Sequence, residues 1–324
     1  MGALDGRVAI ITGAGRGIGR EHALLFAAQG AKVVVNDRGV GVEGSGTDAS
    51  AAEHVVEEIE ALGGEAVAST DDVADWEGGK RLVERAIEAF GELHVLVNNA
   101  GILRDRMIVN MTEDDWDNVI RVHLKGHFVP TRHAAAYWRE RTKAGEEVRA
   151  CIVNTSSTSG LLGNPGQANY GAAKAGIATL SVIAAHELGR YGVRVNAIAP
   201  AARTRMTEWT PGLSDIVKAP ADKSHFDVWD PANVSPLVAY LATERCPLTG
   251  RVFFVQGGTV RNVQNWTMAE AIDRQSRWTV EDLEREMSKL SSGQAAESGQ
   301  AAEAKGTAGT KGTAEAKGTA EAKG

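Results

Sequence analysis

Short apolar runs alternate with longer segments of helical periodicity over the first 260 residues of the chain. Each run is mainly apolar on both of its faces, which is typical of a strand buried on both sides of a sheet. Helices that connect such strands return the chain to the same end of the sheet, so the strands run parallel, and right-handed crossovers make the sheet doubly wound. The sequence therefore predicts an α/β fold with a doubly wound parallel sheet of seven strands. The predicted strands cover residues 8–11, 32–36, 66–69, 94–97, 150–153, 193–198 and 251–255.

The end of the chain has a different composition. From residue 301 to Gly324 it consists of four hexads, AAEAKG, TAGTKG, TAEAKG and TAEAKG, which contain no large apolar residue. Burial cannot offset the entropy of ordering such a segment, and a glycine in every hexad works against a continuous helix. We therefore expect one domain over residues 1–260, a further segment over 261–290 and a flexible low-complexity tail over 291–324. An inert linker is favoured over a docking segment for the tail.

Charge and composition exclude several classes of protein. The chain has 35 Lys and Arg against 42 Asp and Glu, a formal net charge of -7, whereas nucleic-acid binding requires a basic surface. No apolar run has the length of a membrane span, and the first residues lack the pattern of a secretory signal. The two cysteines, Cys151 and Cys246, provide neither a disulfide framework nor a zinc cluster, and no His, Asp or Glu shows metal-ligand spacing. We expect a cytoplasmic protein without nucleic-acid, membrane or metal partners, in which Cys151 faces the core.

A glycine-rich turn follows the first predicted strand. Residues 12–19 read TGAGRGIG. Glycines let the backbone turn tightly and approach a pyrophosphate, and the amides at the start of the following helix point at that anion. Such a turn can also be purely structural, but the strand before it and the helix after it favour a dinucleotide site. The expected cofactor-binding residues of this turn are Thr12, Gly13, Arg16, Gly17, Ile18 and Gly19.

The second predicted strand ends in residues that bear on the choice of cofactor. Asp37 lies where a carboxylate can bind the ribose hydroxyls of NAD and repel the additional phosphate of NADP. Arg38 follows directly, and its guanidinium is able to pair with that phosphate instead. We favour NAD over NADP because of Asp37, for which an ordinary turn residue is the alternative interpretation.

A tyrosine and a lysine stand four residues apart in the segment YGAAK, at the start of an apolar helical segment. This spacing places Tyr170 and Lys174 on one helical face. A free phenol titrates near 10, so it is a poor base at neutral pH unless a cation stabilises the phenolate. Lys174 and an oxidised nicotinamide could together lower the pKa of Tyr170 by about 3 units. Tyr170 would then take a proton from an alcohol or return it to a carbonyl, although a Tyr–Lys pair alone is more often a surface pair.

A serine loop supplies the context for this pair. Residues 154–157 read NTSS, and Ser157 precedes Tyr170 by 13 residues, across a glycine-rich return loop. Such a loop can bring the hydroxyl and the phenol to the same substrate oxygen, which Ser157 would polarise. In isolation the serine segment is an ordinary polar loop. The amides of Asn98 and Asn99, at the end of the fourth predicted strand, are expected to bridge neighbouring strands below the cofactor.

Together these segments resemble the motif set of the short-chain dehydrogenase/reductase superfamily over about residues 6–260. A closer similarity is to the (3R)-hydroxyacyl-CoA dehydrogenase unit of peroxisomal multifunctional enzyme type 2 and its stand-alone bacterial relatives. That similarity is carried by the segments NDRGV, NNAGILRDRM, DWDNVIRVHLKG, NPGQANYGAAKAG and IAPAARTRMT. The resemblance implies a Rossmann-type fold and a C-terminal extension over 261–290 that packs on the domain.

The resemblance also implies roles for individual residues. Tyr170 would be the catalytic acid and base, Lys174 would lower its pKa and hold the ribose, and Ser157 would orient the substrate oxygen. Tyr170 and Lys174 therefore also count among the residues that contact the cofactor, and Ser157 and Tyr170 among those that contact the substrate. The other implied cofactor-binding positions are Asp72 and Val73 beside the adenine, Asn99, Ala100 and Gly101 near the nicotinamide ribose, and Pro200 and Thr204 at the nicotinamide pocket.

Two positions depart from the superfamily pattern. The long helical segment carries Val122-His123-Leu124, where much of the superfamily has an Asn that relays protons. His123 could carry such a relay because an imidazole both accepts and donates a proton, and a packing histidine is the alternative interpretation. Pro200 is followed by Ala201 rather than by the usual glycine, which leaves the path of that loop open.

The implied activity is that of an NAD(P)-dependent oxidoreductase acting on CH–OH groups. We expect it to interconvert a (3R)-hydroxyacyl-CoA and a 3-oxoacyl-CoA in fatty-acid or sterol side-chain oxidation. The alternative is a 17β-hydroxysteroid dehydrogenase or an NADPH-dependent reductase of 3-oxoacyl thioesters. A non-catalytic nucleotide sensor is disfavoured because Ser157, Tyr170 and Lys174 are all present.

The helical segment that follows Tyr170 carries apolar residues all round, which is typical of a helix that is buried on every side. Because the sheet covers only one of its faces, we expect a homodimer or a homotetramer. The resemblance also implies a mobile substrate lid over residues 203–230, where relatives carry one. Its large side chains, Met206, Trp209 and Trp229, either line an acyl or steroid site or pack the lid itself.

Overall fold

The computed structural model describes residues 2–209, 214–222, 224–264 and 266–290. The chain divides into two units, Met1–Asn265 and Trp266–Gly324, and the sheet belongs to the first. The expected tail over 291–324 lies outside the described residues. The boundaries at 260 and 290, and the packing of the extension on the domain, stay predictions.

The first unit is built on a single sheet of eight strands, in the order β3-β2-β1-β4-β5-β6-β7-β8. The seven predicted strands are all present and parallel, which confirms the doubly wound Rossmann-type fold. An eighth strand, which was not predicted, returns from β7 through a hairpin and pairs with it antiparallel. The strands are β1 (Val8–Thr12), β2 (Lys32–Asn36), β3 (Glu65–Ser69), β4 (Val95–Asn98), β5 (Ala150–Thr155), β6 (Val193–Pro200), β7 (Val252–Gln256) and β8 (Thr259–Val263).

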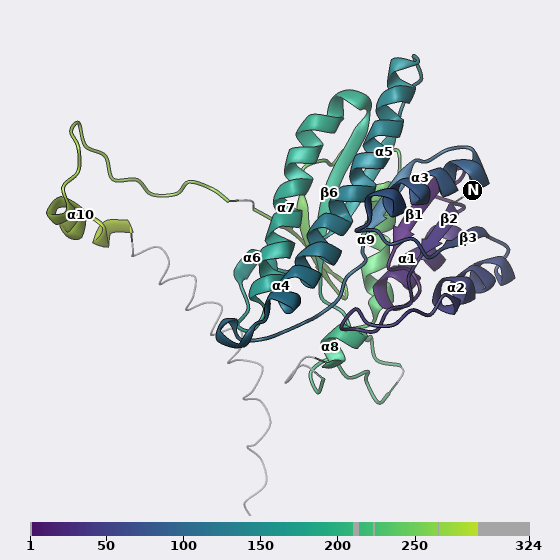
Figure 1. The fold of residues 1–324 in the computed structure, drawn as a ribbon, viewed down its shortest axis with the longest axis horizontal. Helices are drawn as coiled ribbons and strands as arrows, with labels where there is room; N and C mark the ends of the chain where they lie inside the picture. The colour runs from purple at the N-terminus through teal and green to yellow at the C-terminus, as the bar shows by residue number, and fades with distance from the viewer. Residues whose placement is uncertain (1, 210–213, 223, 265, 291–324) are drawn as a thin grey trace, which may run out of the picture. The chain divides into compact units, whose positions relative to one another are not determined.

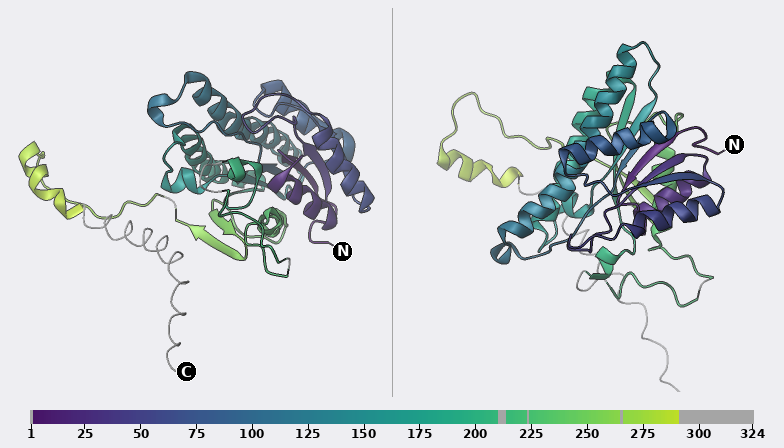
Figure 2. Two further views of the ribbon diagram at one scale, coloured as in Figure 1. Left: turned by 90° about the horizontal axis from the view of Figure 1, so that it is seen from below. Right: turned by 45° about the vertical axis from the view of Figure 1, so that its right-hand side comes forward.

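Helices cover both faces of the sheet (Figures 1 and 2). Alternate side chains of each strand enter one of two buried clusters, as in β1, where Ala9 and Ile11 point to one cluster and Val8 and Ile10 to the other. Cys151 lies fully buried in the first cluster, which confirms that it faces the core. The first cluster packs against α1 (Gly17–Ala28), α2 (Ser50–Ala61) and α9 (Ser235–Ala242), and the second against α3 (Trp76–Phe90), α5 (Gly126–Lys143) and α7 (Ala168–Leu188).

The long helix that the sequence predicted over about residues 113–141 is interrupted. It consists of α4 (Glu113–Ile120), a π-helical turn over Arg121–Lys125 and then α5. Thr112 begins α4 with a capping box, because its hydroxyl accepts from the amide of Asp115. The π-turn holds His123, and π-turns inside helices occur frequently at functional sites.

Short helical elements complete the first unit, and one helix is described in the second. In the second unit Thr279 caps the helix, because its hydroxyl accepts from the amide of Asp282 at 3.2 Å. Among the described residues, no helix combines the length and the apolar character needed to cross a membrane. The short elements of the first unit are η1 (Ile108–Asn110), α6 (Thr158–Leu162), η3 (Gly189–Tyr191), α8 (Arg205–Trp209) and η4 (Pro231–Val234), and the helix of the second is α10 (Val280–Glu286).

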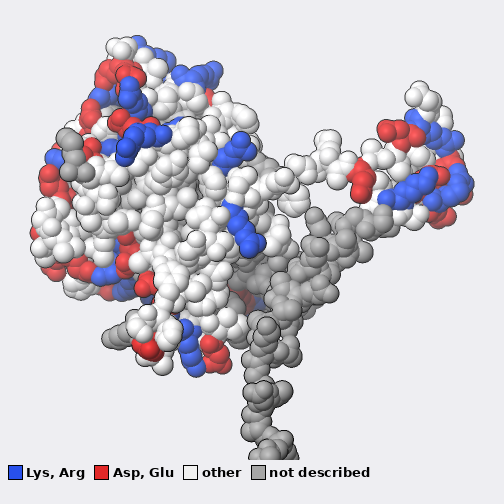
Figure 3. Space-filling view, turned by 180° about the vertical axis from the view of Figure 1, so that it is seen from behind, with Lys and Arg blue, Asp and Glu red and all other residues white. Residues whose placement is uncertain are grey.

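Charged side chains are unevenly distributed over the surface. On the face drawn in Figure 3, Lys, Arg, Asp and Glu lie mainly along the periphery, and both signs are mixed there. The middle of this face carries few charged side chains. A mixture of both signs accords with a chain whose 35 basic residues nearly balance its 42 acidic ones.

Candidate active site

The predicted site residues meet at the carboxyl ends of β1, β4 and β5. The strand order reverses between β1 and β4, and ligands of doubly wound sheets bind at this switch point. Thr12 and Asn99 fasten the two strands together here. The Thr12 hydroxyl accepts from the amides of Asn99 and Ala100 at 2.9 and 3.1 Å. The Asn99 side chain donates to the carbonyls of Thr12 and Gly13 at 3.0 and 3.1 Å, so it holds the turn from below.

The glycine turn has a shape that only glycines permit. Gly13 and Gly17 have φ values of +64° and +54°, which side chains rarely tolerate. A Cβ atom on Gly19 would lie 2.1 Å from the carbonyl oxygen of Gly13. The backbone amides at the start of α1 are therefore left open to an anion, and the turn fits the pyrophosphate of a dinucleotide. Ile18 packs on the adjacent core.

Three arginines lie near Asp37: Arg16 and Arg38 have carboxylate partners, whereas Arg205 interacts electrostatically with Asp37 itself. Asp37 itself accepts from the amides of Gly15 and Gly39 at 2.9 and 2.6 Å, which fixes its carboxylate beside the turn. Arg38 donates to Asp72 at 2.8 Å, and the guanidinium of Arg16 lies 3.0 Å from Asp48. Neither of these two arginines is therefore an unpaired cation beside Asp37.

The remaining predicted cofactor positions border the same region. Asp72 also pairs with Arg121, and Val73 is buried in the core next to it. The methyl group of Thr204 lies 3.7 Å from the point where a Cβ of Gly17 would stand, so this threonine faces the glycine turn. Pro200 ends β6. The amide of Ala201, the residue that replaces the usual glycine, continues the pairing with β7 by donating to Val255 at 2.9 Å.

A buried amide network lies below the site, as expected for Asn98. Its side chain donates to Asn154 at 2.9 Å and to the hydroxyl of Thr131 at 3.1 Å. Asn154 donates in turn to Ser181 of α7 at 2.9 Å. The network thereby ties β4, β5, α5 and α7 to one another and fixes the base of the site.

Lys174 is buried next to Tyr170 on α7. Only 2% of Lys174 is exposed, and its ammonium donates to the carbonyl oxygen of Thr155 at 2.6 Å. The Nζ atom lies 5.4 Å from the centroid of the Tyr170 ring. Burial lowers the pKa of Lys174 to about 7, because the charged form loses its hydration.

Tyr170 contacts the other predicted catalytic residues. Its ring meets the ring of His123 edge to face, with centroids 5.1 Å apart, and its phenol hydrogen-bonds to Ser157. Burial raises the pKa of Tyr170 to about 12, although the hydrogen bond from Ser157 opposes this shift. The expected lowering of this pKa by Lys174 together with an oxidised nicotinamide stays a prediction.

His123 reaches this cluster because the π-turn pushes it inward. Its Nε2 atom lies 2.7 Å from the carbonyl oxygen of Ile102, whereas its Nδ1 atom is buried and has no hydrogen-bond partner in the described part of the chain. Burial holds the pKa of His123 well below its usual range, so the ring is neutral. A Cβ on Gly101 would stand 2.3 Å from this ring, which explains the glycine at that position.

Three polar residues of the site had no signal in the sequence analysis. Asp105 lies in the loop after β4 and accepts from Gln167 at 2.7 Å. Gln167 also binds Ser159 in the serine loop, at 2.7 Å. Asn169 is fully buried and donates to the carbonyl of Arg104 at 3.0 Å. In the sequence, the only indication that these three residues belong to the site is that they lie within the segments NNAGILRDRM and NPGQANYGAAKAG.

The expected lid is described in part. Arg203 forms an ion pair with Asp227 at 2.5 Å, which joins the two ends of the segment. Met206 and Trp229 are partly buried. The side chain of Trp209 and residues 210–213 lie outside the described part, so the proposed lining of the substrate site stays a prediction.

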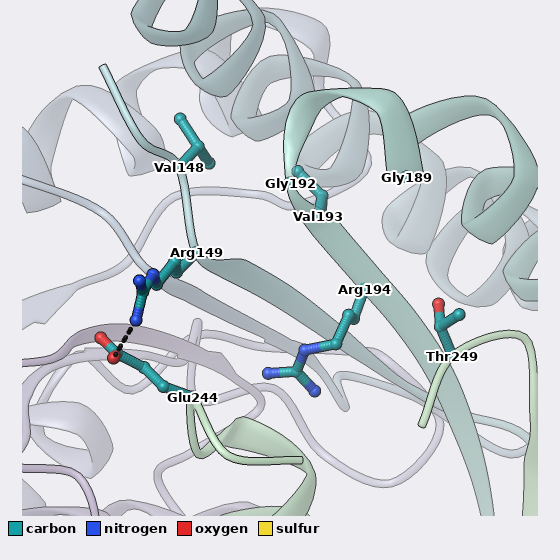
Figure 4. A pocket seen from close by; sticks show the side chains of 8 residues that line it. All are labelled: Val148, Arg149, Gly189, Gly192, Val193, Arg194, Glu244 and Thr249. Carbon is teal, nitrogen blue, oxygen red and sulfur yellow. Dashed lines mark ion pairs between the residues drawn. The ribbon is translucent and has the colours of Figure 1, made fainter. Parts of the chain in front are cut away.

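A separate pocket lies at the opposite ends of the strands. Figure 4 shows it between Val148 and Arg149, which precede β5, and Val193 and Arg194, which begin β6. Its most prominent interaction is the ion pair of Arg149 with Glu244 at 3.5 Å. Doubly wound sheets bind ligands at their carboxyl ends, so this pocket is not the candidate active site.

A doubly wound sheet, a glycine turn at its switch point and a half-buried tyrosine next to a buried lysine together define a nucleotide-binding α/β oxidoreductase. The chain belongs to the short chain dehydrogenase family, whose model matches residues 7–211. It is therefore an oxidoreductase that acts on CH–OH groups with a nicotinamide cofactor.

Individual relatives cover most of the chain. It is 47% identical over 264 residues to hydroxyacyl-CoA dehydrogenase ChsB1 of Mycobacterium tuberculosis, covering 79% of each protein. It is 48% identical over 246 residues to peroxisomal multifunctional enzyme type 2 of Drosophila melanogaster, covering 76% of this chain but 38% of that enzyme. The crystal structure of a short chain dehydrogenase from Mycobacterium avium superposes with a TM-score of 0.79 at 52% identity, covering 89% of this chain and 95% of that one.

Gly160 lets α6 approach the backbone of α7 directly at Lys174. A Cβ there would lie 2.5 Å from the amide nitrogen of Ala175 and 2.6 Å from the carbonyl carbon of Lys174. We expect Gly160→Ala to lower the free energy of unfolding by about 1–3 kcal/mol, because backbone atoms cannot yield as side chains do. Urea unfolding measures this. The control Gly258→Ala, whose Cβ would meet nothing within 4 Å, should change stability by less than about 0.5 kcal/mol. Equal losses in the two variants would contradict the close approach.

Proposed function

We propose that this chain is an NAD-dependent dehydrogenase of (3R)-hydroxyacyl-CoA thioesters, which it converts to 3-oxoacyl-CoA. The observation that carries the proposal is the pair of a half-buried Tyr170 and a buried Lys174, with Ser157 beside the phenol. The choice of substrate rests on the relatives, two of which are named as a hydroxyacyl-CoA dehydrogenase and a multifunctional enzyme. The chain spans 38% of the second, so only the dehydrogenase step is proposed.

Ser157 and Tyr170 act on the same substrate oxygen in this proposal. Ser157 lies near enough to the phenol to lower its pKa, so an alcohol oxygen placed between the two hydroxyls would contact both. Ser157 donates to the oxygen and polarises the carbonyl that develops. Tyr170 takes the hydroxyl proton during oxidation and returns it during reduction. When bound, NAD supplies the acceptor for the hydride that leaves carbon 3.

Lys174 stabilises the phenolate form of Tyr170 that this proton transfer requires. A phenol with a pKa near 12 is almost fully protonated at neutral pH, so it needs additional positive charge to act as a base. With a pKa near 7, Lys174 is able to hold a proton about half of the time at neutral pH. An oxidised nicotinamide beside the pair adds a second positive charge, and the two together stabilise the phenolate.

His123 is proposed as a relay between this pair and the surrounding chain. Its ring touches Tyr170, and its buried Nδ1 atom has no hydrogen-bond partner among the described residues, so a neutral imidazole has an acceptor nitrogen there. The π-turn places the ring of His123 against the phenol of Tyr170. The same placement suits either a packing role or a relay role for His123.

The carboxylate of Asp37 and the ion pairs of Arg16 and Arg38 support NAD as the cofactor, and among the described residues Arg205 is the arginine near Asp37 for which no such pair is present. A 2′-phosphate beside Asp37 would meet its carboxylate, while the guanidiniums of Arg16 and Arg38 are paired with Asp48 and Asp72. The proposed contacts of the dinucleotide are therefore the glycine turn for the pyrophosphate, Asp37 for the adenine ribose, Asp72 and Val73 for the adenine, and Asn99, Ala100, Gly101, Lys174, Pro200 and Thr204 for the nicotinamide half.

The cytoplasmic location stays a prediction.

Replacement of Tyr170 by Phe tests the chemistry. We expect the oxidation rate of a 3-hydroxyacyl-CoA to fall by about 10³-fold, because the proton acceptor is lost while the ring remains. NAD binding, followed by fluorescence quenching, should be retained. The control Tyr240→Phe removes a hydroxyl from an exposed tyrosine of α9 and should leave the rate unchanged.

Two results, one from that comparison and one from a comparison of substrates, would contradict parts of the proposal. One is a Tyr170→Phe variant that retains more than a tenth of the wild-type rate. The other is a wild-type chain that turns over a 17-ketosteroid, or a 3-oxoacyl thioester with NADPH, far better than a 3-oxoacyl-CoA with NADH. The second outcome would leave the proposed role of Tyr170 intact and replace only the substrate.

Replacement of Asp37 tests the choice of cofactor. We expect Asp37→Asn to reduce the preference for NAD over NADP by at least about 10-fold in kcat/KM, because the charge that repels the extra phosphate is lost. The exposed carboxylate of Asp117 on α4 provides the control, and Asp117→Asn should leave the ratio unchanged. A wild-type chain that prefers NADPH would overturn the argument from Asp37.

We further propose that the chain assembles through α5 and α7 with a second copy of itself. A groove between these helices is lined by Phe128, Arg132, Ile183 and Glu187 among others, and Phe128 and Ile183 are 44% and 48% exposed. Basic and acidic residues occur in the same groove, so two copies related by a two-fold axis can pair opposite charges. A second copy would cover the apolar side chains of α7 that the sheet does not reach.

A charge in this groove tests the assembly. We expect Ile183→Asp to convert an oligomer to a monomer, because a desolvated carboxylate has no partner at an apolar contact. Sedimentation velocity at micromolar concentration measures the change. The matched control Leu62→Asp places the same charge on a residue that is 75% exposed at the end of α2, and its oligomeric state should equal that of the wild type. A wild-type chain that sediments as a monomer would refute the assembly.

A further inference from the structure

A carboxylate outside the proposed catalytic set lies in the loop that packs against the start of α7, the helix of Tyr170. Asp105 stands in the loop after β4, and its Oδ2 atom accepts from the side-chain amide of Gln167 at 2.7 Å. Its Oδ1 atom is buried and has no hydrogen-bond partner among the residues that the structure describes. Burial raises the pKa of Asp105, and its charge in turn raises that of Tyr170. The carboxylate is therefore within electrostatic range of the phenol, and among the described residues its hydrogen-bond partner is Gln167.

Gln167 connects Asp105 to the serine loop. Its Oε1 atom accepts from the hydroxyl of Ser159 at 2.7 Å and from the side chain of Asn164 at 2.9 Å. Its amide group points the other way, to Asp105, so both ends of the side chain are fixed. Ser157 begins the short helix in which Ser159 lies, and it accepts from the Ser159 amide at 3.2 Å. A chain of contacts thus leads from Asp105 to the hydroxyl that binds the phenol.

Backbone contacts hold the loop of Asp105 against the start of α7. The amide of Arg106 donates to the carbonyl of Gly166 at 2.8 Å. Two residues before it, the carbonyl of Arg104 accepts from Asn169 at 3.0 Å, and Asn169 accepts from the amide of Tyr170 at 2.7 Å. These contacts hold the carboxylate of Asp105 at a fixed distance and in a fixed direction from the phenol of Tyr170.

We propose that Asp105 is a positioning residue for the Ser157–Tyr170 pair, which it serves in two ways. Its carboxylate fixes Gln167 and thereby the serine loop, and its negative charge favours the protonated phenol, the form that a ketone needs. The proposal rests on the proposed role of Tyr170 as the acid and base. The negative charge of Asp105 thus keeps Tyr170 protonated, which suits ketone reduction. In alcohol oxidation the positive charge of the oxidised cofactor must offset this effect before Tyr170 accepts a proton.

Several other groups face the same phenol. Lys174 approaches it along α7, and the neutral ring of His123 covers it from the π-turn. Arg106, next to Asp105, lowers the pKa of that carboxyl, but less than burial raises it. The guanidinium of Arg104 points to the carboxylate of Asp114 instead. Asp105 is thus the negative charge, among the described groups, that acts on Tyr170.

The replacement Asp105→Asn separates the charge from the hydrogen bond, because an amide oxygen can still accept from Gln167. The rising limb of kcat/KM against pH for alcohol oxidation, and the falling limb for ketone reduction, should both move down by about one pH unit. Loss of structure would lower both rates without moving either limb. Asp114→Asn removes an exposed carboxylate from the same region and should move neither limb.

A second variant isolates the hydrogen bond. Gln167→Ala keeps the charge of Asp105 but releases the serine loop, so kcat should fall by about 10-fold while the limbs stay in place. Unchanged limbs in Asp105→Asn would overturn the electrostatic part of the proposal. An equal shift in Asp114→Asn would do the same, and an unchanged kcat in Gln167→Ala would overturn the positioning part.

A spectroscopic titration makes the inference independent of turnover. The ultraviolet absorbance of tyrosinate, measured with saturating NAD and corrected by the titration of Tyr170→Phe, reports the ionisation of Tyr170 alone. Asp105→Asn should move this step to lower pH. If Tyr170→Phe keeps full activity, the proposed function fails, but the absorbance step still shows whether Asp105 controls the phenol.

Discussion

The site depends on one hydrogen bond in a place that water hardly reaches. The ammonium of Lys174 donates to the carbonyl of Thr155 at the end of β5, and no described carboxylate pairs with it. A cation buried in this way loses much of its hydration, which is why its pKa falls to about 7. The same burial raises the pKa of Tyr170 to about 12. Lys174 is therefore poised near neutrality, whereas the phenol keeps its proton until added positive charge stabilises the phenolate.

Close backbone approaches make this burial possible. Gly160 lets α6 lie directly on α7 at Lys174, and Gly101 makes room for the ring of His123. Gly19 lets α1 start against the carbonyl of Gly13, which keeps the anion site open. At each of these positions a methyl group would collide with backbone or with a buried ring. The glycines thus bring the phosphate turn, the π-turn and the Tyr–Lys helix together at one edge of the sheet.

Much of this arrangement could be predicted from the sequence, because strands buried on both faces leave continuous apolar runs. The seven parallel strands and the meeting of Ser157, Tyr170 and Lys174 follow from that pattern and from the spacing of the motifs. The hairpin strand β8 was missed because its segment, TVRNV, is largely exposed and lacks such a run. In the π-turn over Arg121–Lys125 the backbone hydrogen bonds span five residues instead of four. This change is too short to alter the apolar periodicity of the sequence.

The electrostatics could not be predicted in the same way. The sequence shows that Lys174 follows Tyr170 by one helical turn, but not how deep both lie, and depth sets the direction of the pKa shift. Arg38 stands next to Asp37 in the sequence, whereas its partner Asp72 is 34 residues away. Asp105 and Gln167 come together only through the fold, across 62 residues.

The rate of alcohol oxidation by Lys174→Met tests the central claim most directly. Methionine fills a similar volume without a charge, so the fold should persist, as urea unfolding would show. The account predicts a loss of at least about 100-fold at neutral pH, because the phenolate loses the cation that stabilises it. A folded variant that oxidises the substrate at nearly the wild-type rate would show that the buried ammonium does not control the phenol.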